Sequence, residues 1–136
     1  MPDLKTSMHI AASGMKVQTE RLRIIAQNIA NAESTGTTPG AEPYQRKTIT
    51  FQNVLDRELG HEVVKVTQVG RDETPFPMEY NPGHPAANAD GYVLKPNVQT
   101  LIETQDMKQA QRSYEANIST IEITKRMLSR TLELMR

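Results

Sequence analysis

Apolar residues recur at helical spacing at both ends of this chain and lose that pattern in the middle. Near the start the steps alternate between three and four residues, with Gln18 as the polar interruption, through Leu4, Met8, Ala11, Met15, Leu22, Ile25, Ile29 and Ala32. Near the end the interruption is Lys125, and the apolar positions are Tyr114, Ile118, Ile121, Leu128, Leu132 and Met135. Side chains at this spacing share one helix face, so each end is predicted to form a long amphipathic helix.

Residues with defined positions at helix ends set the predicted boundaries. The first helix is predicted from Pro2 to about Ala32, with Asp3 as its N-cap. The last is predicted from Thr100 to the end of the sequence, because Thr100 and Glu103 have the spacing of a capping box. The predicted organisation is a 1–35 N-terminal core helix, a 36–99 extended insert and a 100–136 C-terminal core helix, with the two helices forming one core domain.

Between the helices, short segments alternate as strands do. Strands are predicted at 44–51, 62–69 and 92–94, whereas 54–59 is ambiguous. The prolines of residues 75–85 exclude a helix and a central strand. The predicted fold class is therefore mainly α, with long terminal helices forming a coiled-coil core around a small β-rich, irregular insert.

The composition indicates a chain that packs against other chains. Only 37% of the 136 residues are hydrophobic and 4% aromatic, which is little for a private core. Two broad apolar helix faces cannot cover each other completely, so we expect self-assembly or assembly with similar subunits. Equal numbers of acidic and basic residues give no reason to expect nucleic acid as a partner. Neither a cleavable signal peptide nor a membrane-spanning run is predicted.

Nothing in the sequence has the spacing of a catalytic, cofactor or metal site. The chain has no cysteine, and His9, His61 and His84 stand at no zinc-ligand spacing. No serine lies in a nucleophile motif and no phosphate-binding loop is present, so no small-molecule substrate is expected. Gln18 and Lys125 either set the register of a helix pair or reach solvent at gaps in its packing.

Several short motifs resemble those of a known family. Ser13-Gly14-Met15 and Asn28-Ile29-Ala30-Asn31-Ala32 are similar to the N-terminal motif of the bacterial flagellar rod, hook and hook-associated proteins. Within this axial family the middle of the chain resembles a proximal rod protein, through Tyr80-Asn81-Pro82-Gly83-His84-Pro85, Asp90-Gly91-Tyr92-Val93 and Pro96-Asn97-Val98. Arg112-Ser113-Tyr114-Glu115-Ala116-Asn117 is similar to the family's C-terminal helix motif. Thr104, where the family has methionine, and the loop 36–42 depart from the pattern.

The resemblance implies a structural subunit of the flagellar basal-body rod, not an enzyme. It implies export without a signal peptide through the flagellar type III apparatus, and assembly in the rod that spans the periplasm. The implied partners are other rod proteins, copies of this chain, the adaptor between membrane ring and rod, and a muramidase or cap. Such a rod transmits motor torque and encloses the export channel.

The residues expected at subunit interfaces are those of the two stripes with the motif asparagines: Leu4, Met8, Ala11, Met15, Leu22, Ile25, Asn28, Ile29, Asn31, Ala32, Tyr114, Asn117, Ile118, Ile121, Leu128, Leu132 and Met135. Two alternatives remain open from the residues alone. One is a soluble helical adaptor that binds a partner helix in a groove. The other is an enzyme of unrecognised type.

Overall fold

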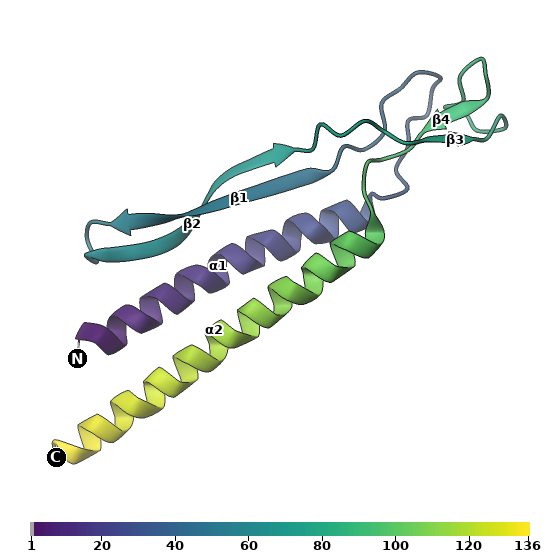
Figure 1. Cartoon of the computed structure of the whole chain (residues 1–136). Coiled ribbons are helices and arrows are strands. Elements are labelled where there is room, and N and C mark those ends of the chain that lie inside the picture. Colours follow the sequence, from purple (N-terminus) through teal and green to yellow (C-terminus); the bar gives the residue numbers. More distant parts are fainter. Residues whose placement is uncertain (1) are drawn as a thin grey trace. The chain divides into compact units, whose positions relative to one another are not determined.

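The computed structural model describes residues 2–136 and contains two long helices and four strands. In chain order the elements are α1 (Pro2–Ala30), β1 (Lys47–Asp56), β2 (His61–Arg71), β3 (Met78–Tyr80), β4 (Tyr92–Leu94) and α2 (Thr100–Leu134) (Figure 1). The strands form two separate two-stranded sheets, β1 with β2 and β3 with β4. The predicted pair of long helices around a small strand-containing insert is confirmed. The helices hold less than half of the chain, so "mainly α" describes it only loosely.

The helix boundaries agree with the sequence to within two residues, but the end groups differ. α1 begins at Pro2, so Asp3 lies in the first turn and the prediction that it is the N-cap was wrong. Proline suits the first helical position because its fixed φ is already helical and it has no N–H to leave unpaired. α2 begins at Thr100 as predicted. The pairing of the helices as a coiled coil remains a prediction.

The strands lie near the predicted segments, with one addition. β1 begins three residues later than predicted and runs on into the ambiguous segment, and β2 contains all of 62–69. β4 coincides with the predicted 92–94. β3 was not predicted, because neighbouring prolines argued against a strand. It is only three residues long and pairs on one side only, with β4, so those prolines interrupt no ladder.

Contacts divide the chain into two compact units, and α1, α2, β1 and β2 contribute residues to both. The hairpin unit comprises Met1–Leu22, Ile49–Gln68 and Lys108–Arg136. The motif unit comprises Arg23–Thr48 and Val69–Met107. The grouping of the two helices into one core domain, apart from the insert, stays a prediction.

In the hairpin unit, α1 contacts α2 on one side and the β1–β2 hairpin on another. The Arg21 guanidinium donates to Gln109 Oε1 at 3.3 Å, and Gly14 lies against Asn117, so the two helices run antiparallel. On the hairpin side, the Val64 N–H donates to Ser13 Oγ at 3.3 Å. The buried side chains of this small core are Ala11, Val17, Val63, Ala110 and Thr124.

In the motif unit, β3 and β4 pair antiparallel with Glu79 opposite Val93, whose side chain is buried. Gly91 precedes β4 with a φ of +85°, which side chains disfavour. A β-carbon there would also stand 2.9 Å from Tyr80 Cε2. The Tyr80 and Tyr92 rings meet edge to face at 5.4 Å. Both the turn and its close packing therefore favour glycine at position 91 of the Asp90-Gly91-Tyr92 motif.

Candidate functional site

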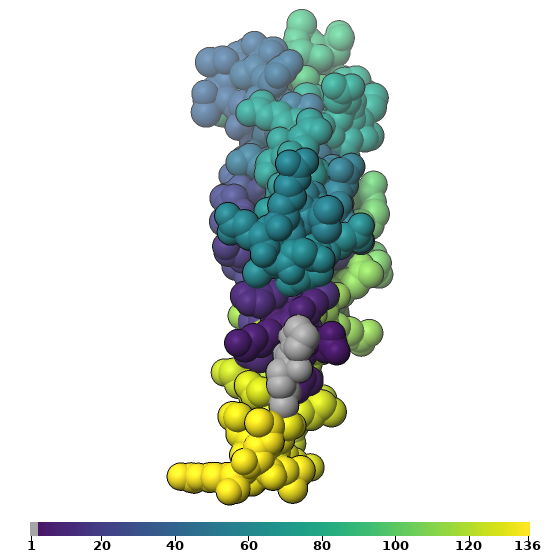
Figure 2. Space-filling model, turned by 90° about the vertical axis from the view of Figure 1, so that its left-hand side faces the viewer, coloured from purple at the N-terminus to yellow at the C-terminus, as the bar shows by residue number. Residues whose placement is uncertain are grey.

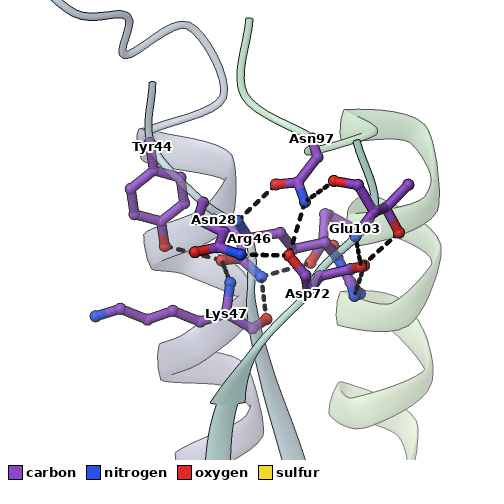
Figure 3. A network of polar contacts seen from close by, with 9 residues as sticks. Asn28, Tyr44, Arg46, Lys47, Asp72, Asn97 and Glu103 are labelled. Atoms are coloured by element: carbon purple, nitrogen blue, oxygen red, sulfur yellow. Dashed lines mark hydrogen bonds and ion pairs between the residues drawn. The ribbon is translucent and has the colours of Figure 1, made fainter. Parts of the chain in front are cut away.

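The densest group of polar contacts lies in the motif unit, where the end of α1, the segment before β1 and the start of α2 meet (Figure 3). Its members come from five stretches of the chain and form one network of hydrogen bonds and ion pairs, made by Asn28, Tyr44, Arg46, Lys47, Asp72, Asn97 and Glu103.

Asn28 is at the centre of the network and is only 1% exposed. Its Oδ1 accepts from the Tyr44 hydroxyl and from the Lys47 N–H, each at 2.9 Å. Its Nδ2 donates to the Lys47 carbonyl at 2.9 Å and to Glu103 Oε2 at 3.3 Å. An amide side chain has two donor hydrogens and two acceptor lone pairs, so Asn28 uses its full capacity inside the chain.

A buried carboxylate and a guanidinium complete the centre. Glu103 is 1% exposed and forms an ion pair with Arg46, which also pairs with Asp72 at 3.3 Å. Burial lowers the pKa of Arg46, but its bond to Glu103 and the charges of both carboxylates outweigh burial and raise that pKa. Burial, followed by the charge of Glu103, raises the pKa of Tyr44, so its hydroxyl stays protonated and able to donate.

Asn97 fixes the chain that enters α2. Its Oδ1 accepts from the Arg46 N–H at 2.7 Å, and its Nδ2 donates to the carbonyls of Asp72 and Thr74 at 3.0 Å each. The Asp72 carboxylate accepts hydrogen bonds from the Thr74 hydroxyl and N–H. Those bonds, and then the charge of Arg46, lower the pKa of Asp72.

The network holds backbone segments together and has no reactive arrangement. A recess of about 220 Å³ beside it is lined by Arg46, Asp72, Asn97 and Glu103, whose polar atoms already bond one another. The Thr74 hydroxyl in the lining donates to Asp72, but the lowered pKa of Asp72 makes this carboxylate a weak base, and no histidine or lysine among the residues described lines the recess. Across residues 2–136, no three histidine or acidic side chains gather where they could hold a metal. Within the same span, neither helix is long and apolar enough to cross a membrane.

The histidines contact backbone groups, a threonine and each other. His84 Nδ1 accepts from the Ala86 N–H at 3.0 Å, so Nε2 carries the proton and donates to Thr35 Oγ1 at 3.2 Å. His61 Nδ1 is 2.9 Å from the Leu59 carbonyl and therefore donates to it. The rings of His9 and His61 are 6.2 Å apart. His84, which belongs to the proline-rich motif, thus ties that motif to the loop after α1.

In the hairpin unit, further motif residues are explained by close packing within the chain. Ser13 Oγ donates to the Ile10 carbonyl at 2.7 Å and receives the Val64 N–H. A β-carbon on Gly14 would stand 2.8 Å from Asn117 Nδ2, so a larger residue would displace the Asn117 side chain from its present position. The N-terminal and C-terminal motifs therefore meet each other at Gly14 and Asn117.

The predicted interface residues fall into three groups by exposure. Ala11, Ile25 and Asn28 are buried within the chain. Leu132 and Met135 are 57% and 73% exposed. The remainder are half-buried, namely Leu4, Met8, Met15, Leu22, Ile29, Asn31, Ala32, Tyr114, Asn117, Ile118, Ile121 and Leu128. Their role between subunits stays a prediction.

Gln18 and Lys125, the polar residues that interrupt the two apolar stripes, differ in their exposure. Lys125 is exposed and the neighbouring Thr124 is buried, so the covered face of α2 passes through Thr124. Gln18 is half-buried, and its Oε1 is buried without a hydrogen-bond partner among the residues described. Register control therefore remains a prediction for Gln18. Lys125 instead reaches solvent, which was the other possibility that the sequence left open.

Sequence reasoning did not assign Tyr44, Arg46, Lys47 and Asp72 to a site. These residues form no motif, and their partners in the network lie far away in the sequence. Glu103 was noticed only as a capping-box residue, but its carboxylate bonds Asn28 and Arg46 instead. Its position was a signal: a charged residue on the apolar side of a helix needs a buried partner.

Comparison with known proteins identifies the same family that these motifs resemble. Residues 89–134 match the family model described as flagellar basal body rod FlgEFG protein C-terminal. A flagellar basal-body rod protein FlgC of Agrobacterium fabrum is 50% identical over 136 residues, covering 100% of this chain and 98% of the relative. The FlgC of Salmonella typhimurium is 40% identical over 92% of each chain. That of Bacillus subtilis is 34% identical over 94% of this chain and 95% of its own.

These matches define the class as flagellar basal-body rod proteins. Within that class, identity of this extent over nearly the full length shows that the chain belongs to the FlgC family. It is a structural subunit of the flagellar basal-body rod and not an enzyme. The family membership decides against both the helical adaptor and the unrecognised enzyme.

Proposed function

We propose that this chain joins copies of itself and other rod proteins through its terminal helices, and that the resulting proximal rod transmits motor torque around the export channel. Membership of the FlgC family supports the assembled state. The physical support is that α2 has more apolar surface than α1 covers. Long helices packed side by side resist twisting, which suits a shaft that carries torque.

One observation carries the proposal. Within the hairpin unit, the face of α2 that turns toward α1 passes through Asn117, Thr124 and Leu128 at helical spacing. The same face continues through Leu132 and Met135, which are exposed. Gly14 lies against Asn117, so antiparallel pairing places the first described residues of α1 near position 129 of α2. Beyond that point the stripe has no α1 residue beside it among those described.

Figure 2 shows this end from one side: the yellow C-terminal residues of α2 extend past the purple first turns of α1. Leu134, on a neighbouring side of the helix, is 89% exposed. Each large apolar side chain left in water forgoes roughly 1.5–3 kcal/mol of burial. A cluster of them on one helix end is characteristic of a surface that another chain covers.

The proposal also includes two further partners, the type III export apparatus and the adaptor between membrane ring and rod. Export through the flagellar type III apparatus requires an unfolded subunit, and a small core that is completed only on assembly would favour unfolding. Contact with the adaptor between membrane ring and rod follows from the place of a proximal rod protein. The neutral net charge keeps repulsion between stacked copies low.

Leu132→Asp tests the proposal in cells that lack the natural gene. The substitution places a carboxylate on the exposed continuation of the stripe, where burial between subunits would cost several kcal/mol. We expect the variant to be made and exported but to give no rods and no swimming. Ser119→Asp, on the opposite, exposed side of α2 and outside the proposed assembly surface, is the matched control and should swim. Normal rods with Leu132→Asp would refute the stripe as an assembly surface.

A further inference from the structure

A groove in the hairpin unit lies on the side of α1 that faces the β1–β2 hairpin. It has a volume of about 740 Å³ and is lined by α1 residues that include Ser13 and Val17 and by hairpin residues that include Leu59, Val64 and Val66. Val17 and Val63 form part of its buried wall. The groove is therefore a hollow beside a helix whose lining combines valine and leucine side chains with Lys16, Glu20 and Lys65, and a mixed surface of this kind suits another amphipathic helix.

The same unit carries an apolar segment that no described residue covers. Leu132, Leu134 and Met135 are 57–89% exposed at the end of α2. We propose, on the basis of the proposed rod function, that this end of α2 docks in the α1–hairpin groove of a second copy of this chain. The apolar side chains of the one would contact the valine and leucine side chains that line the hollow of the other.

The geometry excludes the same copy as donor. α2 contacts α1 at Gly14, whereas the adjacent residue Ser13 bonds to the hairpin. The hairpin and α2 thus lie on different sides of α1 (Figure 1), and the groove is on the hairpin side. Because α2 is helical without interruption to Leu134, its end cannot turn around α1 into the groove. A donor segment and an acceptor groove at different places on one chain make a head-to-tail contact, which generates extended assemblies rather than closed pairs.

Charge favours the same pairing. Residues 125–136, which include the end of α2, carry four basic side chains and one acidic one. The hairpin turn at 56–62, whose Asp56 and Leu59 line the groove, carries three acidic side chains and one basic one. Glu58 and Glu62 of that turn are exposed. Inside the groove the charges of Lys16 and Lys65 balance those of Glu20 and Asp56. The attraction that orients the basic helix end therefore comes from the exposed Glu58 and Glu62 of the turn.

Disulfide trapping tests the docking, and the natural chain has no cysteine to interfere. Cells that lack the natural gene would produce two versions together, one with Leu132→Cys and one with Val66→Cys. After mild oxidation of isolated basal bodies, we expect a disulfide-linked dimer, because bridged cysteines need Cα atoms within about 7 Å. Either version alone should give no dimer.

Leu55→Cys replaces Val66→Cys in the matched control. Leu55 is exposed on β1 and does not line the groove, although its neighbour Asp56 does. Equal dimer with Leu55→Cys, no dimer with Val66→Cys, or a link from Leu132→Cys to a different rod protein would each overturn the proposal. Arg130→Glu should reduce the dimer, and Glu62→Arg in the acceptor copy should restore it.

The outcome separates this inference from the rod function on which it rests. If both cysteine versions are present in rods and the cells swim but no dimer forms, the docking is wrong and the rod function stands. If Leu132→Asp gives normal rods, the proposed assembly through the stripe has failed, whatever the cysteine versions show. Circular dichroism of each purified version against the natural chain gives the check on folding.

Discussion

The two ends of α2 present opposite kinds of surface. Near its start, in the motif unit, Glu103 is buried and charged, and its carboxylate is bonded to Asn28 and Arg46 of the same chain. Near its end, in the hairpin unit, Leu132 and Met135 are apolar and exposed. The first region has its polar groups matched internally, whereas the second has apolar groups with nothing beside them in residues 2–136.

This difference separates folding from assembly within one helix. The motif residues that identify the family, such as Asn28, Gly14 and Asn97, make their contacts within the chain. The exposed end of α2 holds none of these motif residues. Family motifs therefore mark how the subunit folds, and the proposed assembly surface is a continuation of the apolar pattern beyond the reach of α1.

The largest effect is expected for Asn28→Ala. The substitution leaves the N–H and carbonyl of Lys47 and the hydroxyl of Tyr44 without their partner. A buried polar group left unsatisfied costs about 1–3 kcal/mol, so we expect the free energy of unfolding to fall by about 3 kcal/mol. Urea titration of the purified chain, followed by circular dichroism, measures the loss.

Asn31→Ala is the control for that prediction. Asn31 donates to the Gln27 carbonyl at 2.8 Å and accepts from Ser34 at the half-buried end of α1, so its loss should cost about 1 kcal/mol or less. Equal, small losses for both variants in the isolated chain, with rods strongly weakened, would mean that Asn28 acts between subunits. That result would remove the contrast between the two ends of α2.

A smaller effect is expected for Gly14→Ala, at the helix pair of the hairpin unit. The new methyl group would stand 2.8 Å from Asn117 Nδ2. Overpacking costs about 1–3 kcal/mol, and the higher helix propensity of alanine returns roughly 1 kcal/mol, so we expect a net loss of about 1 kcal/mol. In an Asn117→Ala background the same substitution should become neutral or stabilising. A stabilised Gly14→Ala chain with Asn117 intact would show that this contact is loose.

The smallest effect is expected for the stability of the chain at low pH. The lowered pKa of Asp72 means that the folded chain holds this carboxylate ionised more readily than the unfolded chain does. Its stabilisation is therefore present above the usual carboxylate pKa of about 3.9 and is lost as pH falls through the lower folded value. Because Asp72 is partly exposed, we expect well under about 1 kcal/mol.

Asp72→Asn measures that contribution. Its unfolding free energy should differ from that of the natural chain at pH 7 and approach it as the pH falls below about 3. The difference in urea midpoint between the two chains, measured across this range, is the relevant quantity. A constant difference at every pH would show that the ionised form of Asp72 does not stabilise the motif unit.

Local periodicity was sufficient to predict the two helices and most strands. The helix stripes span many turns, so α1 and α2 could be located within two residues at each end. β3 could not, because three residues beside prolines have no periodicity to detect and the strand exists only through its pairing with β4. The network residues Arg46 and Asp72 could not either, because their partners are distant in sequence.

The sequence by itself determined the long terminal helices, the absence of catalytic motifs and the family, since each depends on residue types at short spacings. Only the tertiary structure decided which side of each helix is used within the chain. It placed Thr124 rather than Lys125 on the covered face and gave Glu103 its buried partners. It also showed where α1 stops covering α2. Those facts depend on the register between distant segments, which is set by packing and cannot be read from either helix alone.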